Sequence, residues 1–230
     1  MLRLDRYLSN ATALTRSQAQ RALRGGRVMV EGVTVKQGAT RIPLDARVTL
    51  DGVPVAPPQP RYLMLHKPLG VVCATEDPTH RTAIDLLDQA NPDGLHFAGR
   101  LDLDTTGLVL ISDDGQWTHR IVSPTRDCAK RYRVSLASPP SEVELQRLRE
   151  GVLLKGEKSP TRPAQVQQIG SNELLLGITE GRYHQVKRML AAIGHQVVTL
   201  HREAIGPLEL DPSLALGEFR PLREDEVALF

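Results

Sequence analysis

The feature that most constrains the fold is a proline-rich run, Ala56-Pro57-Pro58-Gln59-Pro60, in a chain of 230 residues. Three prolines in five residues cannot continue a helix or a central strand, because proline lacks a backbone N–H and its ring clashes with the preceding turn. Such a run favours an extended connector. The sequence therefore predicts two unequal domains, residues 1–59 with the connector at its end and residues 60–230.

Charge is divided unevenly between these two domains. Residues 1–59 hold nine Lys and Arg against four Asp and Glu, a net charge of +5, whereas residues 60–230 hold twenty against twenty-three, a net charge of −3. Phosphate contacts provide affinity for nucleic acids without regard to base sequence. We therefore expect the N-terminal domain to bind a polyanion.

Several function classes lack the residues they need. No apolar run approaches the roughly 20 residues of a membrane span, and the N-terminus lacks the apolar core of a signal peptide. Cys73 and Cys128 are far apart, the histidines are scattered, and no nucleotide-binding glycine loop is present. We expect a cytoplasmic protein with reduced thiols, no metal, no membrane contact and, by default, a monomeric state.

The N-terminal domain shows short helical and strand signals. Thr15 is a candidate N-cap for a helix that runs to Leu23 and ends at Gly25-Gly26. Residues 27–30 and 33–36 read as the two strands of a hairpin, separated by Glu31-Gly32. A further hairpin around Asp51-Gly52 joins residues 48–50 to 53–55. This pattern predicts a small α+β domain.

The C-terminal domain has more strand-like runs than helical ones. The predicted helices are residues 82–88, 141–150 with a capping box from Ser141 to Glu144, and 184–194. The predicted strands are residues 62–65, 70–74, 107–112, 132–137, 173–178 and 196–201. Because few βαβ repeats are evident, this α+β pattern favours a mixed, mainly antiparallel sheet flanked by helices.

Two carboxylates stand out in GRLDLDTTGLVL, from Gly99 to Leu110. Asp102 and Asp104 precede a Thr-Thr-Gly turn that leads into an apolar strand, a position that suits the rim of a cleft. We interpret Asp104 as a residue that hydrogen-bonds its own turn. On an extended segment the two side chains would face one side, so a glycoside hydrolase with paired carboxylates is an alternative.

A basic cluster lies in EGRYHQVKRMLAAIG. The apolar residues Val186, Met189, Leu190 and Ile193 have helical spacing and predict the buried stripe of a helix. His184, Lys187 and Arg188 would share another face, with Arg182 near the helix start. They are either solvated helix charges or a site that meets phosphates or a carboxylate.

Tyr132 begins a strand and is surrounded by the basic residues Lys130, Arg131 and Arg133. An aromatic side chain in such surroundings could stack on an RNA base. Tyrosine is also common in the core or on the surface of sheets. Both interpretations of Tyr132 stay open on spacing alone.

Three segments together resemble the motifs of the pseudouridine synthases in which Gly-Arg-Leu-Asp carries the catalytic aspartate. They are GRLDLDTTGLVLISDDG, the Lys-Arg-Tyr segment at Tyr132, and EGRYHQVKRM. LHKPLGVVCAT resembles the family's opening strand, and LHREAIGPLEL through LGEFRPL resembles its closing segment. The N-terminal RLDRYLSNATALTRSQAQRALRGGRVMVEG is similar to an S4 RNA-binding domain. The resemblance implies an S4 domain followed by a pseudouridine synthase catalytic domain.

The resemblance implies a role for three residues in the isomerisation of uridine. Asp102 would be the nucleophile, and Lys187 the nearby cation that an ionised carboxylate in a closed pocket needs. Tyr132 would stack on the uracil or act as a base. No cofactor or metal is implied, and Lys187 should lie within ion-pair distance of Asp102. Two residues depart from the family pattern, His66 in place of a common asparagine and Arg131 in place of a smaller residue, and both concern contacts at the rim.

The remaining predicted site residues would contact RNA. Arg100 would fill the gap that a flipped-out base leaves, and Arg182 would contact phosphate. His184 and Arg188 would join them, and the S4 domain would add a salt-dependent set of contacts. The S4 residues in that set are Arg3, Arg6, Arg16, Arg21, Arg24, Arg27 and Lys36.

The segment DGQWTHRIVSPTR and the chain length are most similar to family members that modify 16S rRNA. This implies uridine 516, in helix 18, as the substrate, in the RNA or in a small-subunit assembly intermediate. A 23S rRNA target is an alternative within the family. A non-catalytic rRNA-binding or assembly factor is the alternative of another class.

Overall fold

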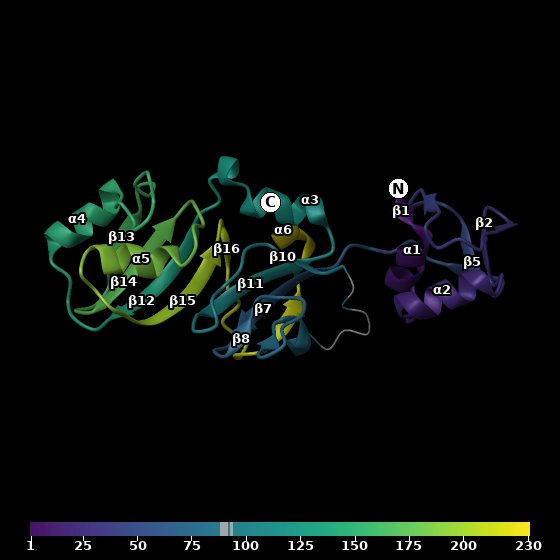
Figure 1. The fold of residues 1–230 in the computed structure, drawn as a ribbon, viewed down its shortest axis with the longest axis horizontal. Coiled ribbons are helices and arrows are strands. Elements are labelled where there is room, and N and C mark those ends of the chain that lie inside the picture. Colours follow the sequence, from purple (N-terminus) through teal and green to yellow (C-terminus); the bar gives the residue numbers. More distant parts are fainter. Residues whose placement is uncertain (88–91, 93) are drawn as a thin grey trace. The chain divides into compact units, whose positions relative to one another are not determined.

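The computed structural model describes residues 1–87, 92 and 94–230, which form two compact units (Figure 1). One unit is built on Met1–Pro60, and the other on Arg61–Leu87 and Leu95–Phe230. Among the described residues, every helix is too short or too polar to span a lipid bilayer.

The unit built on Met1–Pro60 packs two helices, α1 (Leu4–Ala11) and α2 (Arg16–Arg24), with short strands. Thr15 caps α2 as predicted: its hydroxyl accepts from Gln18 N, and the Gln18 side chain accepts in return from Thr15 N. Six strands complete the unit: β1 (Leu2–Arg3), β2 (Val28–Val30), β3 (Val33–Thr34), β4 (Arg41–Ile42), β5 (Val48–Leu50) and β6 (Val53–Val55). The predicted hairpins β2–β3 and β5–β6 are both present in a sheet of order β3-β2-β5-β6.

The second unit is organised around one large sheet. Its order is β13-β14-β12-β15-β11-β7-β17, with β10 beside β11 and β16 beside β15. The strands of this sheet are β7 (Tyr62–Lys67), β10 (His96–Phe97), β11 (Thr106–Ser112), β12 (Lys130–Leu136), β13 (Gln165–Gln168), β14 (Glu173–Ile178), β15 (Val197–Ile205), β16 (Leu208–Glu209) and β17 (Phe219–Pro221). All of its pairings are antiparallel except β11 with β15, so the mixed, mainly antiparallel sheet is confirmed.

Helices cover both faces of this sheet, because its central strands are buried on both sides. Along β7 and β11, alternate residues enter two different hydrophobic clusters. The cluster with Leu65 and Val109 packs against α4 (Glu142–Glu150) and α5 (Gln185–Ala192). The cluster with Met64 and Leu108 packs against α3 (Gly115–Val122) and α6 (Glu224–Val227). Figure 1 shows α4 and α5 beside β12–β15 and α3 beside β10 and β11.

The two halves of the sheet meet at a short parallel seam. Among the described residues, β11 and β15 pair only at Thr106 with His201 and Gly107 with Arg202. Gly107 also lies opposite Lys67 on β7. Its φ of 116° favours glycine, and a Cβ there would lie 2.5 Å from the Arg202 nitrogen and closer still to the Arg202 carbonyl oxygen. Glycine at this position therefore permits the seam.

Several helical segments differ from prediction, among them α6, which the sequence did not predict. The sequence did not predict α1, which begins directly after β1 with no side-chain N-cap, or α3, which Asp114 caps. The predicted helix 82–88 is wrong in extent: the structure has a short strand, β9 (Arg81–Thr82), paired in parallel with β8 (Val71–Val72), and then a single 3-10 turn, η1 (Ile84–Leu86). Asp88 lies outside the described residues. A second 3-10 turn, η2 (Pro124–Arg126), follows α3.

The close approach of Gly107 to Arg202 leads to a prediction about the free energy of unfolding. We expect Gly107→Ala to lower the free energy of unfolding by about 2–5 kcal/mol, because it adds a backbone clash to the cost of a positive φ. Gly70→Ala is the matched control, since Gly70 has a φ of 74° and open space around it, so we expect a loss of about 1–2 kcal/mol. Urea denaturation measures both, and equal losses would contradict a close approach at the seam.

Candidate active site

A cavity of about 620 Å³ opens beside the seam, on the side of the sheet that carries α5. Its walls come from the loop before β11, from β12 and β15, and from the residues that lead into α5. Asp102, Tyr132 and Lys187 all line it, although they are distant in the sequence. The fold thus gathers the three residues that the resemblance assigned to chemistry.

Asp102 and Lys187 form the ion pair that the sequence analysis expected. Lys187 Nζ lies 3.0 Å from Asp102 Oδ2. His184 Nε2 lies 3.4 Å from the other carboxylate oxygen, Oδ1. Asp102 is 29% exposed and Lys187 23% exposed, so the pair faces the cavity without being fully solvated. The carboxylate is held between two nitrogen groups and stays accessible to a ligand.

The interpretation of Asp104 as a residue that only hydrogen-bonds its own turn is wrong. Its side chain does not serve only its own turn: Asp104 Oδ1 lies 2.5 Å from Lys187 Nζ, and the turn is closed instead by Thr105 N donating to the Asp102 carbonyl. The hydrogen bond from Lys187 holds the pKa of Asp104 below its ordinary value. Burial lowers the pKa of Lys187, but its hydrogen bonds to Asp104 and Asp102 outweigh that effect and raise it above its ordinary value. Lys187 therefore remains an ammonium ion between two carboxylates.

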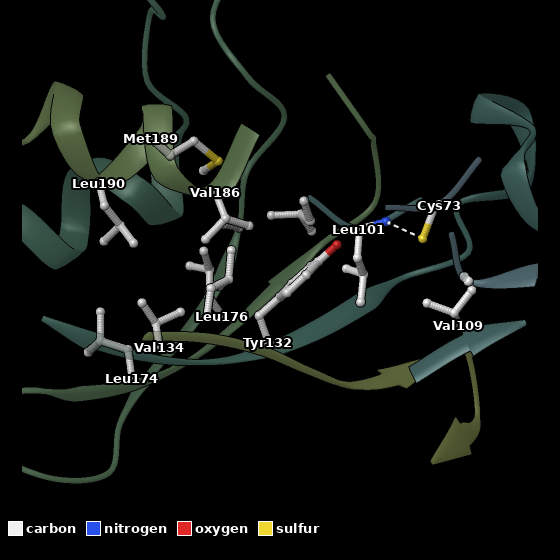
Figure 2. Packing of buried hydrophobic residues seen from close by; sticks show 14 of the residues in the cluster. Cys73, Leu101, Val109, Tyr132, Val134, Leu174, Leu176, Val186, Met189 and Leu190 are labelled. Carbon is white, nitrogen blue, oxygen red and sulfur yellow. Dashed lines mark hydrogen bonds between the residues drawn. The ribbon is translucent and has the colours of Figure 1, made fainter. Parts of the chain in front are cut away.

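Tyr132 lies on β12 with its ring in the hydrophobic cluster below α5. The ring is 8% exposed and lines the cavity. Figure 2 shows it between Leu101 and Leu176, with the hydroxyl pointing toward the loop that carries Leu101. The Leu101 N–H donates to Cys73 Sγ at 3.4 Å. This hydrogen bond joins the loop to the residue that directly follows β8. Tyr132 is thus both a core residue and part of the cavity wall, and its stacking on an RNA base stays a prediction.

Two buried basic residues at the seam beside the site, of which Arg202 lines the cavity, were not predicted. Lys67 and Arg202 lie opposite Gly107 on its two neighbouring strands, and Tyr132 lies opposite Arg202. Arg202 donates to the Leu108 carbonyl at 2.8 Å and to the Arg100 carbonyl at 3.3 Å. It therefore ties the loop before Asp102 to the seam. Both residues belong to segments that carry the resemblance, LHKPLG and LHREAIG, but nothing in their spacing revealed their burial.

Burial is the main influence on the pKa of Lys67. Its side chain is fully buried and its Nζ donates to the Pro68 carbonyl at 2.8 Å. Burial lowers the pKa of Lys67, while the negative charges of Asp102 and Asp104 act in the opposite direction. The pKa of Lys67 stays below its ordinary value, because the effect of burial is the larger one.

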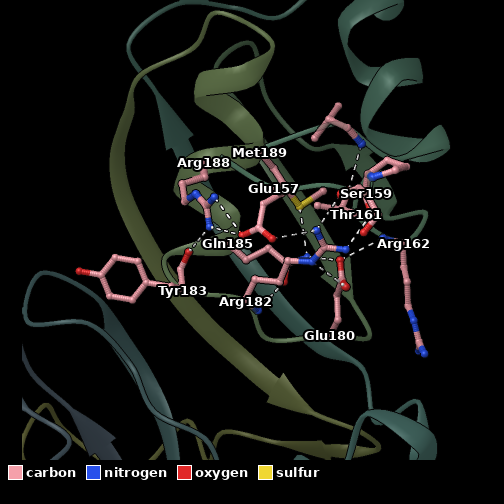
Figure 3. A network of polar contacts seen from close by, with 12 residues as sticks. Glu157, Ser159, Thr161, Arg162, Glu180, Arg182, Tyr183, Gln185, Arg188 and Met189 are labelled. Atoms are coloured by element: carbon pink, nitrogen blue, oxygen red, sulfur yellow. Dashed lines mark hydrogen bonds and ion pairs between the residues drawn. The ribbon is translucent and has the colours of Figure 1, made fainter. Parts of the chain in front are cut away.

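Arg182 and Arg188, both predicted to contact RNA, are engaged within the protein (Figure 3). Arg182 donates to Glu180 and to the carbonyls of Ser159 and Pro160. Arg188 donates to Glu157 and to the carbonyls of Tyr183 and Lys155. Both guanidinium groups therefore brace the segment that leads into α5. The predicted buried stripe of this helix is confirmed at Val186, Met189, Leu190 and Ile193.

The other predicted RNA contacts differ in their surroundings. Arg100 is exposed at the cavity, and no ion pair of its side chain occurs among the described residues. In the N-terminal unit, Arg3 and Arg16 lie 2.8 Å and 3.5 Å from the buried carboxylate of Asp5. Arg27 pairs with Asp51 at 2.5 Å. Of the seven predicted S4 contacts, four form no ion pair within residues 1–87, 92 and 94–230: Arg6, Arg21, Arg24 and Lys36.

A metal site has no support in the arrangement of side chains. In the part of the chain that the structure describes, no three His, Cys, Asp or Glu residues gather in a way that could hold a metal ion. What the cavity offers instead is a carboxylate, an ammonium group, an imidazole and an aromatic ring around one space.

Comparison with known proteins identifies the two units. The family model for RNA pseudouridylate synthases matches residues 61–192, and the S4 domain model matches residues 2–48. A crystal structure of a pseudouridylate synthase superimposes with a TM-score of 0.73 at 45% identity, covering 100% of both chains.

Full-length relatives agree with this match. Ribosomal small subunit pseudouridine synthase A of Vibrio cholerae is 49% identical over 227 residues, 99% of this chain and 98% of the relative. The protein of the same name from Escherichia coli K12 is 49% identical over 228 residues, 99% of both chains. None of the matches reported above is to a glycoside hydrolase, the alternative that the paired carboxylates had raised. The chain belongs to the RNA pseudouridylate synthase family, is an isomerase of that class, and carries an S4 domain ahead of its catalytic domain.

Proposed function

We propose that this protein converts one uridine of 16S rRNA, uridine 516 in helix 18, to pseudouridine, with Asp102 as the nucleophile. The ion pair of Asp102 with Lys187 on the wall of the cavity is the observation that carries the assignment of the nucleophile. The small-subunit target rests on the names of the full-length relatives. The reaction would occur in the cytoplasm, on the RNA or on an assembling small subunit.

The isomerisation exchanges one bond of the uracil for another. The N1–C1′ bond breaks, the base turns while it stays bound, and a C5–C1′ bond forms. The hydrogen on C5 is then lost as a proton, and N1 gains a proton, so atoms balance without a cofactor. What the protein must provide is a carboxylate near C1′ or C2′ and a pocket that retains the free base.

Asp102 suits either route by which the glycosidic bond can break. As a nucleophile it would bond to C1′ as the base departs. In a glycal route it would take the proton from C2′, or Tyr132 would act as the base. Lys187 and His184 on opposite oxygens limit rotation of the carboxylate, which favours a near-attack geometry.

The aromatic and basic groups of the cavity would handle the base and its neighbours. Tyr132 lines the cavity, and its ring would stack on the uracil. Arg100 is exposed and free to fill the gap that the flipped uridine leaves. Arg182 and Arg188 have their donors directed at protein partners, so we assign them to the support of α5 and no longer to RNA.

Exposed cations of the S4 unit would anchor structured rRNA. Arg21, Arg24 and Lys36 are exposed, and phosphate contacts of this kind position a protein without reading sequence. Arg3, Arg16 and Arg27 already pair with aspartates, so their contribution to RNA affinity should be smaller.

The first test replaces the proposed nucleophile. We expect Asp102→Asn to lower pseudouridine formation more than about a thousandfold and to leave RNA affinity nearly unchanged, because the amide keeps the size but not the nucleophilicity of the carboxylate. Pseudouridine is mapped in 16S rRNA, free and within assembly intermediates, by carbodiimide-dependent stops of reverse transcription.

The neighbouring carboxylate provides the matched control. Asp104 shares Lys187 but is 71% exposed, and an exposed ion pair contributes at most about 1 kcal/mol, so we expect Asp104→Asn to retain activity within about fivefold. Equal loss in both variants would contradict a single nucleophile. Wild-type protein that leaves 16S rRNA unmodified, or that modifies 23S rRNA instead, would contradict the proposed target.

The second test concerns the S4 unit. We expect Arg24→Gln to weaken rRNA binding and to reduce the slope of log affinity against log salt by about one unit, because one phosphate contact is lost. Arg27→Gln is the control, since the Arg27 guanidinium is paired with Asp51. Filter binding between low and moderate salt measures both slopes. An equal change in the two variants would argue that ion pairing within the unit does not determine which arginines contact RNA.

A further inference from the structure

Tyr183 is an exposed aromatic residue at the mouth of the cavity. Its side chain is 74% exposed, although the residue lines the same cavity as Asp102. Its ring stacks on the His184 imidazole with centroids 3.8 Å apart and an interplanar angle of 19°. Figure 3 shows the ring directed away from the polar network that surrounds the rest of this segment. One face of the tyrosine is therefore supported by His184.

The backbone beneath this ring is firmly held. Arg188 donates to the Tyr183 carbonyl at 3.0 Å, and the same guanidinium donates to Glu157 at 3.1 Å and to the Lys155 carbonyl at 2.9 Å. On the other side, Arg182 N donates to the Gln185 side chain at 2.8 Å. An exposed ring on a fixed backbone loses little freedom when it binds a ligand. The hydrogen bonds of Arg182 and Arg188 thus fix the backbone that carries Tyr183.

His184 connects this ring to the chemistry of the site. Its backbone has φ 46° and ψ 38°, the left-handed region that residues other than glycine rarely adopt. In this conformation its Nε2 lies 3.4 Å from Asp102, while its ring face lies against Tyr183. Strained backbone of this kind concentrates at functional sites. The stacked pair extends outward from the nucleophile itself.

We propose that Tyr183, backed by His184, is a stacking subsite for the nucleobase adjacent to the target uridine. This inference rests on the proposed function, because the ligand is a neighbour of the nucleotide that enters the cavity. A flipped uridine leaves its neighbours without a stacking partner, and proteins commonly supply aromatic rings to unstacked RNA bases. Every base has a π-face, so the subsite adds affinity without reading the base identity.

The test uses full-length protein and pentaribonucleotides with a central uridine and 2-aminopurine on its 5′ or its 3′ side. With wild-type protein we expect quenching of 2-aminopurine fluorescence in one of the two probes. Tyr183→Ala should abolish that quenching and raise Kd about tenfold, whereas Tyr183→Phe should retain both, because the phenyl ring still stacks. On 16S rRNA, Tyr183→Ala should raise KM about tenfold and change kcat by less than about twofold, as expected for a contact equal in ground and transition state.

Leu153→Ala is the control for removal of an exposed apolar side chain. Leu153 is 61% exposed and does not line the cavity, so we expect no change in quenching, Kd or KM. Absence of quenching with wild-type protein at saturation, or equal quenching with Tyr183→Ala, would overturn the subsite even if pseudouridine forms. Wild-type protein that quenches a probe through Tyr183 but leaves 16S rRNA unmodified would support the subsite and overturn the proposed target. The two failures are therefore distinguishable.

Discussion

The parallel seam between β11 and β15 is the constraint on which the site depends. Each strand pairs antiparallel with neighbours in its own half of the sheet, and the two halves share only Thr106, Gly107 and their partners on β15 among the described residues. The loop that bears Asp102 ends where this seam begins. The Arg202 guanidinium donates to the Leu108 carbonyl on β11 and to the Arg100 carbonyl in the loop, and so it connects the loop to the seam. The cavity therefore draws its walls from both halves.

Charged side chains gather around the cavity. Lys187 contacts two carboxylates of unequal exposure, Arg202 is a buried cation in the cavity wall, and Lys67 is buried beside it at the seam. A buried cation is costly unless nearby groups compensate it. The charges of Asp102 and Asp104 offset only part of the effect of burial on Lys67, whose pKa stays below its ordinary value, and backbone carbonyls accept hydrogen bonds from Arg202.

Local signals in the sequence predicted several elements well. Thr15 and Ser141 carry capping boxes, so α2 and α4 begin where the sequence places them. The Glu31-Gly32 and Asp51-Gly52 turns have positive φ at both positions, which suits two-residue hairpins. Elements without such signals were missed or misjudged: α1 has no side-chain cap, and residues 84–86 complete only one 3-10 turn. Local hydrogen bonding can be read from the order of residues because it involves near neighbours.

The sequence by itself determined the family and the two kinds of domain, and it singled out Asp102, Tyr132 and Lys187 as candidate site residues, since all of these signals lie in short contiguous motifs. Only the tertiary structure decided which charged side chains are engaged by partners within the protein. Arg182 and Arg188 look like RNA ligands in the sequence but donate to carboxylates and carbonyls from distant loops. Asp104 looks like a turn residue but shares Lys187, and Tyr183 gains its place at the cavity from that same brace. Partners 20 to 100 residues apart meet only through packing, and no local pattern records which donor finds which acceptor.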